Sequence, residues 1–238
     1  MKKFLILSIS IMLALSSNAQ TPPNHQAFNK LLKKHVTNAG NVNYKGFAKD
    51  VKDLDSYLNL LSTNAPTTTW SSNEKLAYWI NAYNAFTIKL MINNPSVKSI
   101  KEIAGGKPWD LKFFNIGDKE MNLNDIEHGI VRKDFTEPRI HFALVCASKS
   151  CPKLLNESFE ANKLEKQLAK QAKDFLADSF RNKVDANNPQ LSKLFDWYGN
   201  DFTKTGKTKI AYINQYTSIK INDNATITYI PYDWGKNE

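Results

Sequence analysis

Hydrophobic residues recur at helical spacing through the first ninety or so positions of the chain. A first helix is predicted between residues 24 and 38, with its apolar side at Phe28, Leu31, Leu32 and Val36. Gly40 ends that pattern. A second amphipathic helix, ending before Pro66, is predicted from Phe47, Val51, Leu54, Leu58 and Leu61. The N-terminal part of the chain is therefore expected to be helical.

A third helix is predicted from Ser71 to Asn93. Ser71 and Glu74 have the spacing of a capping box, in which each side chain bonds the other residue's backbone N–H. Asn84 lies in the middle of the apolar stripe, and Asn81 lies at its edge. Because a buried amide destabilises a fold unless it is hydrogen-bonded, we expect this helix to face a polar feature.

After Gly105-Gly106 the pattern becomes mixed. Residues 113–123 predict a β-hairpin that turns at Gly117-Asp118, and the near-continuous apolar run at residues 140–146 predicts a buried central strand. Further helices are predicted at residues 124–132, 159–176 and 189–198, and a last strand at residues 226–229. Residues 210–216 fit either helix or strand.

This order of elements is typical of the α+β class. Helices outnumber strands and do not alternate with them regularly, so we expect a predominantly helical fold with a small antiparallel sheet. The absence of repeats and of low-complexity linkers predicts one domain over residues 20–238.

The first nineteen residues have the pattern of a signal peptide. Two lysines precede an apolar run over residues 4–15, and small residues follow at Ser17 and Ala19. The run is shorter than the roughly 20 residues that cross a bilayer. Cleavage is expected after Ala19, which predicts a periplasmic or secreted protein, and no later segment predicts a membrane span.

Charge changes this picture little. Removing residues 1–19 takes two lysines, so Lys+Arg falls from 32 to 30 against 23 acids and leaves about +7 on the mature chain. A basic surface favours an anionic glycan or peptide as partner, or serves solubility alone. The lysines are spread along helices and do not form an aromatic-interleaved block, so nucleic-acid binding is not predicted.

Both cysteines lie in one loop, Cys146 to Pro152, directly after the predicted strand. In an oxidising compartment, two cysteines five residues apart are most simply a disulfide. Such a small ring stabilises the fold by about 2 kcal/mol and chiefly fixes the shape of the loop.

A second interpretation makes Cys146 a nucleophile, with His141 or His128 as its base and Asn81 or Asn84 orienting the base or binding an oxyanion. His141 and Cys146 would point to opposite faces of a regular strand, whereas His128 precedes the strand on a helix. Independently of catalysis, Asn81, Asn84, Arg132 and Ser148 are the candidate residues of a polar binding pocket. Asp125, His128 and Arg132 form one column, which would otherwise be a solvated polar face.

A metal centre is a third interpretation, since His128, His141, Cys146 and Cys151 are suitable ligand types. The sequence contains neither an HExxH motif nor paired CxxC motifs. No metal and no cofactor are therefore expected.

Several of these segments together resemble the DUF547 domain family. The resemblance is carried by residues 77–86 (AYWINAYNAF), 126–132 (IEHGIVR), 139–148 (RIHFALVCAS), 150–152 (SCP) and 232–234 (YDW). It extends from about Val42 to the C-terminus. The family has no assigned activity, but the resemblance implies that the amide-bearing helix, the His128 helix and the His141–Cys151 segment converge.

A central helix on a small antiparallel sheet is also similar to papain-like and transglutaminase-like cores. Those cores place their nucleophilic cysteine at the start of the helix, where this chain has none. Two functional hypotheses follow: a binding or structural module whose pocket is shaped by a Cys146–Cys151 disulfide, and a hydrolase or acyl-transferase that uses Cys146.

Overall fold

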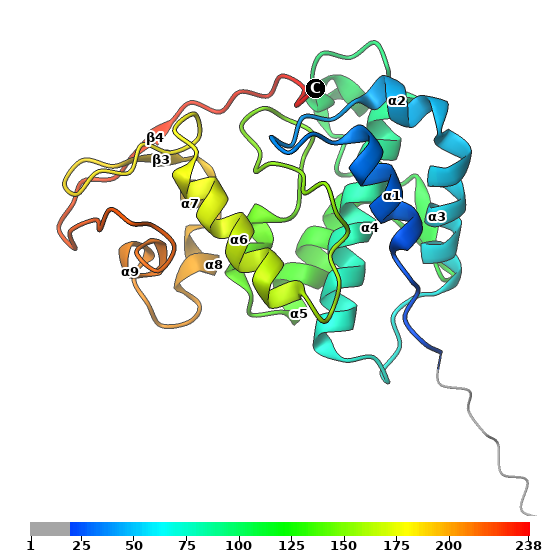
Figure 1. Cartoon of the computed structure of the whole chain (residues 1–238), viewed down its shortest axis with the longest axis horizontal. Coiled ribbons are helices and arrows are strands. Elements are labelled where there is room, and N and C mark those ends of the chain that lie inside the picture. Colours follow the sequence, from blue (N-terminus) through cyan, green and yellow to red (C-terminus); the bar gives the residue numbers. More distant parts are fainter. Residues whose placement is uncertain (1–19) are drawn as a thin grey trace, which may run out of the picture.

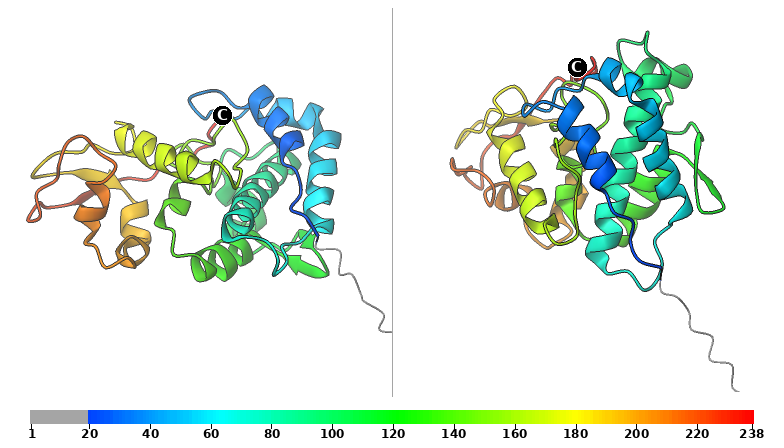
Figure 2. Two further views of the ribbon diagram at one scale, coloured as in Figure 1. Left: turned by 60° about the horizontal axis from the view of Figure 1, so that its bottom comes forward. Right: turned by 45° about the vertical axis from the view of Figure 1, so that its right-hand side comes forward.

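The computed structural model describes residues 20–238, which contain two hydrophobic clusters. The N-terminal helices lie at one end of the molecule and the segments that follow helix α6 (Leu164–Ala177) lie at the other (Figures 1 and 2). The first cluster includes four N-terminal helices: α1 (Gln26–His35), α2 (Tyr44–Lys49), α3 (Val51–Thr63) and α4 (Ser72–Asn93). The predicted second helix is thus divided in two at Asp50. The predominantly helical α+β class is confirmed.

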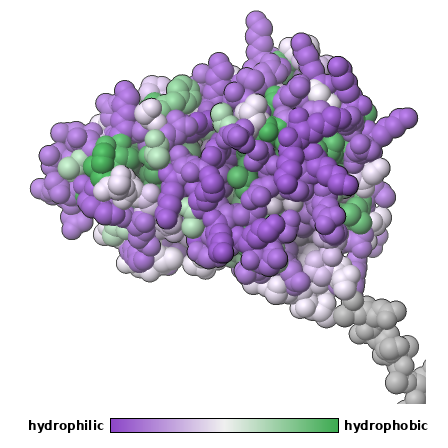
Figure 3. Space-filling view, in the orientation of Figure 1, coloured by the Kyte–Doolittle hydropathy of each residue, from purple (hydrophilic) through white to green (hydrophobic). Residues whose placement is uncertain are grey.

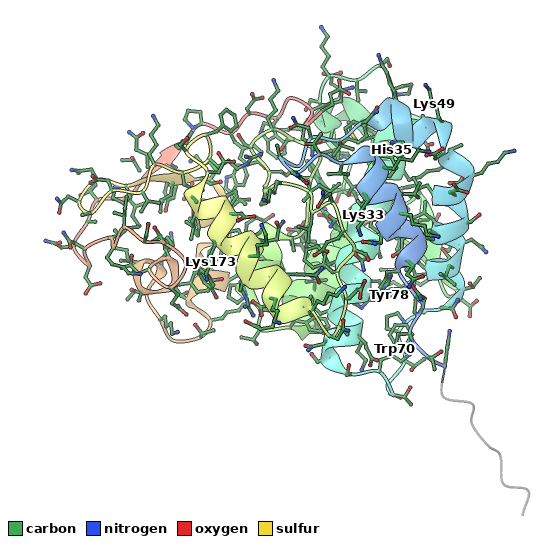
Figure 4. All side chains as sticks on the ribbon, in the orientation of Figure 1. Lys33, His35, Lys49, Trp70, Tyr78 and Lys173 are labelled. Atoms are coloured by element: carbon green, nitrogen blue, oxygen red, sulfur yellow. A yellow bond between two sulfur atoms is a disulfide. The ribbon has the colours of Figure 1, made fainter. Side chains whose placement is uncertain are left out.

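Helix α4 is the centre of the first cluster. Its residues from Leu76 to Ile88 are buried on every side, which explains why apolar residues surround the whole helix. The predicted capping box is present, with Ser71 and Glu74 bonding each other's backbone. Near this end, the Trp70 and Tyr78 rings meet edge to face at 5.6 Å (Figure 4).

The predicted hairpin is confirmed. Strand β1 (Phe114–Ile116) pairs antiparallel with β2 (Lys119–Met121), and Gly117 takes a positive φ of 59° in the turn, where a glycine is favoured. The short 3₁₀ helix η1 (Ile100–Gly106) precedes the hairpin. The π-helix η2 (Asp125–Val131) and the short helix α5 (Arg132–Asp134) follow it.

The central strand predicted at residues 140–146 is wrong. The segment begins as the 3₁₀ helix η3 (Pro138–Phe142) and continues as a turn, although its residues through Val145 are buried. Pro138 favours a helix start, and Glu137 caps the helix by accepting from the Arg139 N–H. A short continuous apolar run carries no periodicity, so it does not distinguish a strand from a buried helical turn.

The second cluster contains the C-terminal half of α6 (Leu164–Ala177), whose first half packs in the first cluster. It also contains α7 (Leu194–Trp197), α8 (Gly199–Thr203) and α9 (Lys209–Ile213), together with a parallel pair, β3 (Gln190–Ser192) and β4 (Thr228–Ile230). The lysine-rich helix and the last strand are confirmed, and the ambiguous segment is helical at α9. The helix predicted over residues 189–198 is wrong in its first half. That half is strand β3, which pairs with β4. The Ser192 N–H donates to the side-chain oxygen of Asn182 at 2.9 Å.

After β4 the chain returns to the first cluster as the C-terminal strap, residues 231–237. The strap lies on the cysteine loop: Lys149 donates its N–H to the Gly235 carbonyl at 2.7 Å, and Ser150 donates to that of Asp233 at 3.2 Å. Its end reaches Val42, whose N–H bonds the Asn237 carbonyl, so the C-terminus lies near α2 (Figure 1).

The surface shown in Figure 3 is mostly hydrophilic, with hydrophobic residues in small separate patches. Within residues 20–238, no helix combines the length and the hydrophobicity needed to cross a bilayer. The signal peptide predicted for residues 1–19 lies outside the described residues.

Candidate functional site

A pocket of about 270 Å³ opens where the two hydrophobic clusters meet. Six aromatic side chains line it: Tyr83, Trp109, Trp197, Tyr198, Tyr232 and Trp234. The remaining lining residues are mostly polar or charged: Gly106, Lys107, Asp110, Asn124, Glu127, His128, Cys146 and Leu194. The pocket therefore combines ring faces with a few charged groups, a composition typical of small-molecule sites.

The aromatic residues come from four separate parts of the chain. Tyr83 lies on α4, Trp109 follows η1, Trp197 and Tyr198 end α7, and the strap supplies the last two rings. The Trp234 ring lies 5.7 Å from that of Trp109 and 5.9 Å from that of Trp197. Because the strap brings Trp234 between residues of both clusters, the pocket forms only when the strap is docked.

The disulfide Cys146–Cys151 closes the loop on which the strap lies, as the sequence predicts. Cys151 is buried, whereas Cys146 lines the pocket. The Tyr232 hydroxyl lies 3.3 Å from the Cys146 sulfur and 3.2 Å from that of Cys151. Since disulfide sulfurs carry no proton, Tyr232 donates, and its oxygen accepts from the Ser148 hydroxyl at 3.1 Å. The loop and the strap thus hold each other's shape.

Glu127, on η2, is the most deeply buried charged group of the pocket, with 6% of its surface exposed. One carboxylate oxygen accepts from the Tyr198 hydroxyl at 2.7 Å. Within residues 20–238 it forms no salt bridge. Burial, followed by the negative charge of Glu127, raises the pKa values of both Tyr83 and Tyr198. Both hydroxyls consequently stay protonated around the carboxylate.

A second polar network lies beside the pocket and is centred on Asp201, which is buried on α8. His141 Nε2 lies 2.8 Å from Asp201, Arg132 donates to the same oxygen at 2.6 Å, and Lys204 lies 3.0 Å from the other. Burial acts to raise the pKa of Asp201, but the hydrogen bonds from these partners outweigh it and hold that pKa well below 3.8. Asp201 is therefore ionised.

His141 is fixed in this network and does not reach the pocket. Its ring stacks on Tyr198 at 3.9 Å, and burial lowers its pKa below 6.5 despite its bond to Asp201. A neutral ring donating to an ionised carboxylate is a structural pairing that holds α8 against η3.

The side chains of the two asparagines of α4 also form hydrogen bonds with backbone groups. Asn84 donates to the Ala143 carbonyl and accepts from the Val145 N–H, both at 2.9 Å. Asn81 bonds the N–H and carbonyl of Phe159 at 2.9 and 2.8 Å. Neither residue lines the pocket. The polar feature expected to face α4 is the backbone of two irregular segments.

The remaining predicted site residues lie in or near the pocket. His128 and Cys146 both line it, and Ser148 reaches it through Tyr232. Arg132 donates to His128 Nδ1 at 2.9 Å while it pairs with Asp201. Among the described residues, no hydrogen bond joins Cys146 to either His128 or His141.

Sequence reasoning did not single out most of the pocket. Trp109, Trp197 and Tyr198 were not candidates, and Tyr83, Glu127, Tyr232 and Trp234 entered only within segments that carry the family resemblance. A usable signal exists: three of the five tryptophans lie within three residues of a glycine, in Gly106-Lys107-Pro108-Trp109, Trp197-Tyr198-Gly199 and Trp234-Gly235. A tryptophan beside a glycine lies on a loop or at the end of a helix, where its ring can line a pocket.

The comparisons with known proteins match one part of the chain. No curated protein and no solved structure matches the chain, so the similarity to papain-like and transglutaminase-like cores stays a prediction. A family model does match residues 67–176. This range contains α4, Glu127, His141 and the cysteine loop, but not the C-terminal strap. The family that this model describes is "Protein of unknown function, DUF547", which agrees with the resemblance noted in the sequence.

Proposed function

We propose that this protein is a ligand-binding module that acts outside the cytoplasm and holds a small molecule in the aromatic pocket. The observation that carries the proposal is the convergence of six aromatic side chains on a pocket of about 270 Å³ beside a buried carboxylate. Exposed aromatic rings have a large hydrophobic area, and grouping them around an open pocket is favourable where a ligand covers them.

The cysteine loop supports binding over catalysis. Cys146 shares its sulfur with Cys151, and a thiolate is needed for nucleophilic attack. His141 and both α4 amides, which a catalytic mechanism would use, are bonded to Asp201 or to the backbone. The disulfide instead stabilises the loop that carries the strap, which is a binding-site architecture.

One observation favours the second candidate, a thiol-dependent hydrolase or acyl-transferase: Cys146 and His128 line the same pocket. After reduction, Cys146 would be the accessible nucleophile and His128 the only histidine of the pocket among the described residues. This candidate requires activity that appears with a reductant and is lost in Cys146→Ser.

Ligand binding is tested by thermal unfolding of the purified oxidised protein with a panel of sugars, amines, amino acids and short peptides. At least one compound should raise the unfolding temperature of the wild type and fail to do so for Trp197→Ala, which removes an exposed ring at the pocket rim. A panel without any Trp197-dependent shift contradicts the proposal. Export is tested separately by the intact mass of the exported chain, which should begin at Gln20.

A further inference from the structure

The aromatic pocket holds a buried carboxylate, Glu127, that forms no salt bridge within residues 20–238. Glu127 is buried, with 6% exposure, and lines the pocket, yet its hydrogen-bond partners are the uncharged hydroxyls of Tyr198 and Tyr83. A buried carboxylate is costly unless a cation or several donors compensate it. Its position therefore favours a ligand that brings a positive charge.

The nearest fixed cation is already paired elsewhere. Arg132 lies one helical turn from Glu127, but its guanidinium donates to Asp201 at 2.6 Å and to His128 at 2.9 Å. Lys204 is likewise directed at Asp201. At the rim, Lys107 and Asp110 are both exposed and have opposite charges. Among the described residues Glu127 therefore has no salt-bridge partner, and Arg132 acts on its charge only through space.

The walls around this carboxylate consist largely of tryptophan and tyrosine rings. The negative face of an aromatic ring attracts cations, and tryptophan does so most strongly. The protein already uses this attraction beside the pocket, where the Lys101 ammonium lies 4.8 Å from the centre of the Trp234 ring. Lys101 is not a lining residue, so the pocket remains open with this contact in place.

The number of hydrogen bonds that a cation must form decides which kind of cation suits the pocket. A primary ammonium has three N–H donors, and ring faces do not replace the water that these donors lose. One oxygen of Glu127 is already occupied by Tyr198. A quaternary ammonium has no donors and loses little on leaving water, so it suits aromatic walls with one carboxylate. The pocket, at about 270 Å³, is slightly below the usual range for drug-sized ligands and suits a compound of the size of choline.

We propose that the pocket binds a quaternary ammonium group, enclosed by Trp109, Trp197, Trp234 and Tyr232 and neutralised by Glu127. This inference rests on the proposed binding function and names its ligand class. The same chemistry occurs in free choline and in the headgroup of phosphatidylcholine, and the experiment below separates these sources.

The test is calorimetric titration of the oxidised protein with choline and with its neutral carbon analogue, in which a tert-butyl group replaces trimethylammonium. Choline should bind with a dissociation constant of about 1 mM or tighter, and the neutral analogue should bind about tenfold or more weakly. Equal affinities, or no binding of choline, overturn the inference.

Variants show whether the pocket is responsible. Glu127→Gln keeps the acceptor for Tyr198 and removes the charge, so choline affinity should fall about tenfold or more while the neutral analogue is unaffected. Glu120→Gln removes an exposed carboxylate of β2 and should change neither affinity. If Glu127→Gln fails to fold, Trp197→Ala is the alternative, because its ring is 47% exposed and supports little of the core.

Phosphatidylcholine vesicles separate the two sources. Co-sedimentation that free choline competes away identifies a lipid headgroup, whereas binding of choline without co-sedimentation identifies a small molecule. A neutral sugar that binds in a Trp197-dependent manner, with no choline binding, would overturn the cation inference and leave the proposed binding function intact.

Discussion

The hydroxyl of Tyr232 lies 3.3 Å from the sulfur of Cys146, although 86 positions separate the two residues in the chain. This contact joins the C-terminal strap to the disulfide loop and closes the pocket between two hydrophobic clusters. Burial raises the pKa of Tyr232 to about 12, so its hydroxyl keeps its proton and remains a donor.

Tyr232→Phe tests this contact. The substitution keeps the ring on the pocket wall and removes the bonds of the hydroxyl to Ser148 and to the disulfide. We expect the free energy of unfolding in a urea titration to fall by about 1 kcal/mol. Tyr229→Phe is the control, since that hydroxyl accepts only from the Lys209 side chain, and it should have a smaller effect. A Tyr232→Phe variant as stable as the wild type would contradict the role of the contact.

The Cys146–Cys151 disulfide should be formed in all molecules of the non-reduced protein, and it should stabilise the pocket. A thiol assay on unfolded, non-reduced protein should find no free thiol, because both cysteines are paired. The double variant Cys146→Ser/Cys151→Ser should lose about 2 kcal/mol of unfolding free energy, since the ring is small. Because the strap rests on this loop, the double variant should also bind pocket ligands more weakly. Two free thiols in the non-reduced protein would refute the pairing.

Asn84 should behave as a structural residue. Asn84→Ala leaves the Ala143 carbonyl and the Val145 N–H without their partner in a buried site, so we expect a loss of about 2–3 kcal/mol of unfolding free energy. Asn73→Ala, at an exposed position in the first turn of the same helix, should change it by no more than about 0.5 kcal/mol. Similar values for the two variants would show that Asn84 does not support the segment before the cysteine loop.

Stability should decrease on acidification. Burial lowers the pKa of His25 from 6.5 to about 4 and also lowers that of His141, so both rings are neutral in the folded protein over a range where the unfolded chain takes up protons. The unfolded state gains more protons, and unfolding free energy is lost as the pH falls from about 6.5 towards 4. His25→Gln should reduce this slope in urea titrations at several pH values. If His25→Gln left the pH dependence of the unfolding free energy unchanged, the lowered pKa of His25 would be contradicted.

Much of the fold follows from local patterns in the sequence. Helix α4 combines a capping box with a long apolar pattern, and the β1–β2 hairpin has a glycine where the turn requires a positive φ. Local chemistry determines both elements. The segment at residues 140–146 is different, because the bonds from Asn84 on another helix determine its path.

The candidate site depends still more on contacts between distant residues. The disulfide was predictable because its cysteines are five residues apart, whereas Asp201 meets His141 from a helix 60 positions away. Glu127 lies in a segment that carries the family resemblance, but its importance appears only when its partners and its burial are known. Sequence spacing indicates which residues share a helix face, but not which segments meet.

The most direct test of the binding site is fluorine NMR of the protein labelled with fluorotryptophan, because the five tryptophans contain their own controls. Trp109, Trp197 and Trp234 line the pocket, whereas Trp70 and Trp79 are buried elsewhere in the first cluster. On titration with choline, the three pocket resonances should shift together with one dissociation constant while the other two stay in place. Five unmoved resonances, or shifts at Trp70 and Trp79 alone, would contradict a choline site in this pocket.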